Sequence, residues 1–112
     1  RRAAGARRLS LAMVAWASHM RRILAQLGED VVWTHGGSPV TVRGVYLAPH
    51  RQVSLGEMVI VGDEDPMFAV MSADVPGLAG GDTIQRGSTT YQVKPSLEPD
   101  PVSGVTVMQL EA

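Results

Sequence analysis

The sequence predicts a mainly β fold, a small β-barrel or sandwich of about seven antiparallel strands with an N-terminal α-helix. Three observations predict it. Apolar residues follow a helical period up to Leu27, the period changes to two after Gly28, and turn residues recur at short intervals from there onward. The length of 112 residues suits one folded unit, and a 45% hydrophobic content is typical of globular chains. We therefore expect a basic helix over residues 1–28 and a β domain over residues 29–112.

The first expected element is an amphipathic helix over residues 8–27. Its apolar side chains are spaced by three and four positions and form one stripe, made of Leu9, Met13, Trp16, Met20, Ile23 and Leu27. Gly28 follows as the residue that most easily takes a left-handed helix stop. The letters SHM at 18–20 also match a cloning junction, so residues 1–19 are either vector-derived or natural. The unbroken apolar stripe favours one natural helix.

Seven stretches with period-two alternation predict the strands. They lie at residues 31–35, 40–47, 57–62, 67–71, 82–85, 90–94 and 104–110. The letters DEDP between the third and fourth stretches predict a hairpin connection, and RGST does the same between the fifth and sixth. The proline-rich letters PSLEPDPVSG at 95–104 indicate a further connection before the last strand.

The connection over residues 48–56, APHRQVSLG, is polar and longer than a hairpin requires. We predict that it does not pack. Long loops on a small rigid scaffold are where contacts are usually made. The contact residues expected in it are Pro49, His50, Arg51, Gln52, Val53 and Ser54.

Charge is distributed unevenly along the chain. Residues 1–22 hold six arginines and no acid, whereas the remainder holds four basic residues against eleven acids, a net charge of −7. A basic arm on an acidic body suggests contact with phosphate or with an acidic partner, although a solvated terminus is the simpler interpretation. No run approaches the roughly 18 apolar residues that cross a bilayer, so we expect no membrane contact.

The residues that could support catalysis or hold a metal show no functional pattern. The chain has no cysteine, and His19, His35 and His50 lack the spacing of metal ligands. The letters GDEDP lack the full calcium-loop pattern, GLAGGD lacks the Lys-Ser/Thr of a phosphate loop, and GxSxG does not occur. We predict no cofactor, no metal and no enzyme; the weakest alternative is an enzyme that uses His50 with a nearby carboxylate.

Several motifs occur in a characteristic order over residues 28–111. They are Arg43-Gly44-Val45, the long polar loop, a strand pair with an acidic turn, Gly81-Asp82-Thr83-Ile84, Gly87 with Tyr91 and Val93, and Pro99-Asp100 before the last strand. Together they resemble the head–tail joining proteins of long-tailed phages, also called head completion or stopper proteins. The turns between residues 74 and 94 are then scaffolding, with Asp82 bonded to its own turn and Tyr91 packed inward.

The resemblance implies a structural protein of the virion neck, made in the host cytoplasm. Such a protein forms a ring of six or twelve copies below the portal and its adaptor, closes the DNA-filled head and offers the attachment surface for the tail. Its partners would be its own copies, the portal or adaptor, the tail terminator, and genomic DNA that passes through without sequence reading. An alternative function is a β-barrel binding module whose basic helix docks nucleic acid or an acidic protein.

The resemblance also suggests roles for three groups of residues. The polar loop from Pro49 to Ser54 would face the ring lumen or a neighbouring ring. The helix face with Arg21, Arg22 and Gln26 would meet the adaptor or the adjacent subunit. The acidic turn Asp63-Glu64-Asp65 would keep subunit edges from pairing wrongly or repel DNA from the channel wall.

Overall fold

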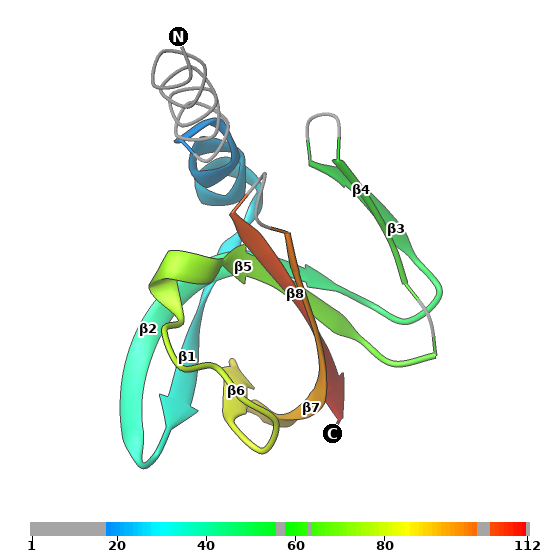
Figure 1. The fold of residues 1–112 in the computed structure, drawn as a ribbon. Helices are drawn as coiled ribbons and strands as arrows, with labels where there is room; N and C mark the ends of the chain where they lie inside the picture. Colours follow the sequence, from blue (N-terminus) through cyan, green and yellow to red (C-terminus); the bar gives the residue numbers. More distant parts are fainter. Residues whose placement is uncertain (1–17, 56–57, 63, 101–103, 112) are drawn as a thin grey trace, which may run out of the picture.

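The computed structural model describes residues 18–55, 58–62, 64–100 and 104–111. In these residues the chain forms one helix, a closed barrel of six strands and a separate two-stranded sheet (Figure 1). The expected mainly β fold with an N-terminal helix is confirmed. The helix covers residues 18–27 of the described chain, and the expected helical residues 8–17 lie outside it. No helix in the described ranges is long and apolar enough to cross a membrane.

The barrel strands follow the order β1-β2-β5-β8-β7-β6, and each neighbouring pair is antiparallel. The strands are β1 (Glu29–His35), β2 (Ser38–Leu47), β3 (Gln52–Leu55), β4 (Met58–Val61), β5 (Met67–Met71), β6 (Thr83–Arg86), β7 (Thr89–Asp100) and β8 (Val105–Glu111), with a 3-10 turn η1 (Ser72–Asp74) after β5. Closure pairs both edges of every barrel strand, so only β3 and β4 retain open edges among the described strands.

The strand pairing around the DEDP turn differs from the expectation. The predicted hairpin between residues 57–62 and 67–71 is wrong, because β4 pairs with β3 and β5 pairs with β2 and β8. The strand β5 is buried along most of its length, because one of its faces lines the barrel interior and the other packs in the cluster outside the wall. A short turn in the sequence therefore joins two strands that belong to different sheets.

The strand β7 is longer than expected. Residues 95–100, predicted as part of a connection, continue this strand as far as Asp100, and residues 97–100 pair with β8. The register shifts between Val93 and Leu97, and Pro95 falls inside this irregular stretch. A proline lacks an N–H, so it is tolerated where the ladder of hydrogen bonds is already interrupted.

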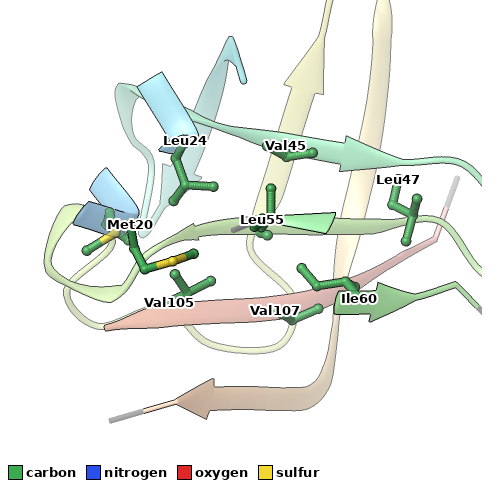
Figure 2. Packing of buried hydrophobic residues seen from close by; sticks show 10 residues of the cluster. Met20, Leu24, Val45, Leu47, Leu55, Ile60, Val105 and Val107 are labelled. Atoms are coloured by element: carbon green, nitrogen blue, oxygen red, sulfur yellow. The ribbon is translucent and has the colours of Figure 1, made fainter. Parts of the chain in front are cut away.

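Two hydrophobic cores share the strands β2, β5 and β8. The interior core fills the barrel with Val31, Trp33, Val42, Phe68, Val70, Val75, Ile84, Val93, Met108 and Leu110. The outer core lies outside the barrel wall and contains Met20, Leu24, Val45, Leu47, Leu55, Ile60, Ala69, Met71, Val105 and Val107 (Figure 2). Successive side chains of a strand point to opposite faces, so these three strands supply both cores. The helix and the β3–β4 hairpin supply the outer core from the other side.

Gly28 joins the helix to β1 by close packing. Its backbone is not among the positive-φ glycines, so the expected left-handed stop is wrong. A Cβ at Gly28 would lie 2.3 Å from the carbonyl oxygen of Leu24 and 2.5 Å from that of Gly44. The side chain of Arg43 donates a hydrogen bond of 2.7 Å to the helix carbonyl of Ala25, which satisfies an acceptor at the helix end. The Arg-Gly pair of β2 thus fixes the helix on the barrel.

Candidate functional site

The predicted contact loop is partly a strand. Pro49 and His50 form an exposed turn, and His50 takes a left-handed backbone with φ of 58°. The backbone N–H of Gly62 donates to the carbonyl oxygen of Arg51 at 2.6 Å and closes the base of the hairpin. The expectation that the loop does not pack is wrong for its second half, because Leu55 is completely buried in the outer core.

The β3–β4 hairpin has one packed face and one exposed face. Val53, Leu55 and Ile60 face the outer core. Gln52 and Ser54 are exposed on β3, and Val59 and Val61 are 54% and 65% exposed on β4. The cross-strand pairs Gln52↔Val61 and Ser54↔Val59 place these four residues on one face. The hairpin thus presents a mixed polar and apolar surface outside the barrel (Figure 1).

Of the three helix residues predicted to contact a partner, one is bonded within the fold and two are exposed. Arg21 donates to a carboxylate oxygen of Asp74 at 3.0 Å and ties the helix to η1. Arg22 and Gln26 are exposed. Among the lysines and arginines of the described chain, Arg22 and Arg51 alone form no ion pair. These two cations are available to a partner.

The predicted acidic turn lies beside the end of β8. The ammonium group of Lys94 bonds a carboxylate oxygen of Asp65 at 2.5 Å. That hydrogen bond raises the pKa of Lys94, and the negative charges of Asp65, Glu111 and Glu64 add to the shift. Asp65 is therefore engaged within the fold, and Asp63 lies outside the described residues. Asp65 bonds the ammonium group, and Glu64 and Glu111 add negative charge at this end of the molecule.

Asp82, a buried carboxylate with three hydrogen-bonding partners, lies at one end of the barrel. Its side chain, 8% exposed as a residue, accepts hydrogen bonds from Trp33 Nε1 at 3.0 Å and from the backbone N–H of Ala79 at 3.1 Å. The Nδ1 atom of His35 lies 2.9 Å from the same carboxylate, and its ring stacks on Trp33. The predicted bond of Asp82 to its own turn is confirmed. The two partners on β1 were not predicted, because nothing local in the sequence relates residues 47 and 49 positions apart.

The environment of Asp82 favours its charged form. Burial by itself raises the pKa of Asp82, but the hydrogen bonds from His35, Ala79 and Trp33 outweigh it, so the pKa lies below the usual range. The carboxylate joins β1 to the turn that enters β6. This arrangement holds two barrel strands together, and His35, not His50, is the histidine that meets a carboxylate here.

We expect the substitution Asp82→Asn to lower the free energy of unfolding by about 2 kcal/mol at neutral pH, because charge-assisted bonds to buried donors are lost. A lowered folded-state pKa gives stability that is present above the ordinary pKa and disappears as pH falls through the folded value. The gap between wild type and variant should therefore shrink on acidification. Urea unfolding at pH 7 and pH 3 measures it, and an equal gap at both pH values would contradict this role.

Comparison with known protein families shows which family the chain belongs to. Residues 13–111 match the family model of the Phage Head-Tail Attachment protein, a range that includes the described helix, the barrel and the hairpin. The chain belongs to this family. Comparison with curated proteins gives no match. Membership indicates a structural role in phage head–tail attachment, with other phage head and tail proteins as partners and the virion as the location. In the described residues no group of three potential metal ligands occurs.

Proposed function

We propose that the chain forms a ring of six or twelve copies below the portal and its adaptor, closes the DNA-filled head and provides the attachment surface for the tail. The observation that supports this proposal is the match of residues 13–111 to the head–tail attachment family. The barrel adds physical support, since its closed wall is a rigid frame without open edges. Contacts between copies are individually modest, but a closed ring adds them.

In the proposed ring, the β3–β4 hairpin faces the lumen or the neighbouring ring. One face of the hairpin is anchored by Leu55 and Ile60, while Val59 and Val61 remain exposed on the other. A free two-stranded hairpin is marginally stable in water, so burial of its inner face is what keeps this projection in place. Genomic DNA passes through the lumen without sequence reading.

In this proposal the helix contacts the adaptor or the adjacent subunit, and the acidic turn prevents wrong contacts. Arg22 and Gln26, both exposed, meet the adaptor or the adjacent subunit, and Arg21 holds the helix through Asp74. The turn with Glu64 repels misplaced strand edges or DNA. The tail terminator binds the face turned toward the tail.

The experiment is complementation of phage that lack this protein. Without it, we expect full heads that leak genome beside unattached tails. Substituting Val59 and Val61 by lysine should reduce joined particles by roughly tenfold, equivalent to about 1.4 kcal/mol of lost contact. The control substitutes Thr41 and Thr90, exposed on the barrel, by lysine.

The proposal fails if phage lacking the protein still join heads to tails. The role of the hairpin fails if both lysine variants join equally well. Salt-sensitive DNA binding by the isolated chain that disappears in Arg22→Ala, together with normal joining, would instead support the alternative of a nucleic-acid-binding module.

A further inference from the structure

A groove of about 520 Å³ lies between the hairpin and the outer wall of the barrel. Val59 and Val61 of β4 line one side, and Met67 of β5 and Val107 of β8 line the other. Val59, Ile60 and Val61 of β4 border it together with the following Gly62, so the unpaired edge of this strand contributes to the wall. The groove therefore combines apolar side chains with polar surface, beside open backbone groups.

The rim of this groove is acidic. Glu98 borders it, is exposed and forms no ion pair in the described part of the chain. Glu111 follows Gln109, another residue of the rim, on the same face of β8. Glu111, Asp65 and Glu64 act together on Lys94 nearby. An occupant that carries several positive charges and apolar side chains would match both properties of the groove.

The chain itself contains a segment with this chemistry. Residues 1–17 include four arginines and no acid. The apolar stripe of the helix continues into this segment at Leu9, Met13 and Trp16. The described helix uses Met20 and Leu24 in the outer core of its own copy, and its other end rests on the barrel at Gly28. Leu9, Met13 and Trp16 therefore precede, in the sequence, the helix residues that pack in the outer core of their own copy.

We propose that the segment of residues 1–17 of one copy binds in this groove, beside its acidic rim, on a second copy. The inference rests on the proposed ring and names the contact that closes it. A basic segment and an acidic groove are two different surfaces, and a head-to-tail contact between different surfaces is what generates a ring. It also gives a role to the four arginines of residues 1–17, which face a chain that carries a charge of −7 after residue 22.

The absence of cysteine from the chain allows a direct test. One preparation carries Ala15→Cys and a second, of different mass, carries Gln109→Cys in the groove. Under mild oxidation of the mixture, a disulfide between the two masses can form only between copies. We expect several-fold more of this heterodimer than with Gln85→Cys, an exposed position on β6, and a decrease as salt is added.

Charge reversal provides the specificity control. Glu98→Arg should reduce the heterodimer, and combining it with Arg7→Glu and Arg8→Glu in the other preparation should restore it. Equal crosslinking at positions 85 and 109, or no rescue by the reversed charges, would overturn the inference. A disulfide that forms within a chain carrying both cysteines, without any heterodimer, would also overturn it. If the crosslinking test fails while head–tail joining still depends on the protein, this inference is wrong and the proposed function stands. The two failures are therefore distinguishable.

Discussion

Replacing Gly44 by alanine should lower the free energy of unfolding by about 3 kcal/mol, at the upper end of the cost of overpacking a core. A Cβ at Gly44 would lie 2.3 Å from the carbonyl oxygen of Ala69 and 2.7 Å from the ring of Phe68. The oxygen belongs to β5, which pairs with β2 at this position. The oxygen can move only if the two strands separate, and separation exposes both hydrophobic cores.

Thr41→Ala is the matched control, because Thr41 lies on the same strand with its side chain exposed. Urea unfolding followed by circular dichroism gives both free energies. We expect a change within about 0.5 kcal/mol for the control. A loss no larger than this at Gly44 would show that β2 and β5 tolerate a wider separation, and the tight contact would then not explain the Arg43-Gly44 pair.

Much of the barrel could be predicted because its signals are local. The letters MFAVM are apolar at every position, and the strand they form, β5, contributes to both cores. The helical stripe correctly placed Met20 and Ile23 toward the body of the protein, whereas its last member, Leu27, is 58% exposed and Leu24, which it does not include, is buried. These outcomes depend on periods of 3.6 and 2, which the backbone imposes within a few residues.

The pairing of strands could not be predicted in the same way. β1 pairs with β6, and β5 pairs with β8, across long stretches of sequence. The DEDP turn looked like a hairpin because the four residues suit a tight turn, but turn chemistry does not decide which strand becomes the neighbour. That choice depends on the summed burial of the whole barrel.

For the same reason, some of the candidate contact residues could be predicted from the sequence and others could not. The exposed positions of Arg22 and Gln26 follow from helix geometry. Leu55 is buried in a cluster with Met20 and Val107, which lie 35 and 52 positions away in the sequence. The alternation of Val53 and Leu55 was the one signal for β3. A strand of four residues gives too short a pattern to be recognised among the polar residues around it.

Replacing Leu55 by alanine should loosen the hairpin and strongly reduce head–tail joining. Leu55 is fully buried in the outer core, so the substitution should cost about 3 kcal/mol. The barrel interior is a separate core, and therefore the loss should be concentrated in β3 and β4. Amide hydrogen exchange should accelerate in these two strands more than in β1 or β6.

Leu110→Ala separates this effect from general instability. Leu110 is also fully buried, but in the interior core, so its loss costs a similar free energy without removing the anchor of the hairpin. Complementation of phage lacking the protein should give fewer joined particles with Leu55→Ala than with Leu110→Ala. If joining falls equally in both variants, it follows overall stability and the hairpin is no special contact. If joining falls only with Leu55→Ala, a partner at the head–tail junction requires the anchored β3–β4 hairpin. Both variants are expected to lose similar stability, but only Leu55→Ala changes the position of β3 and β4.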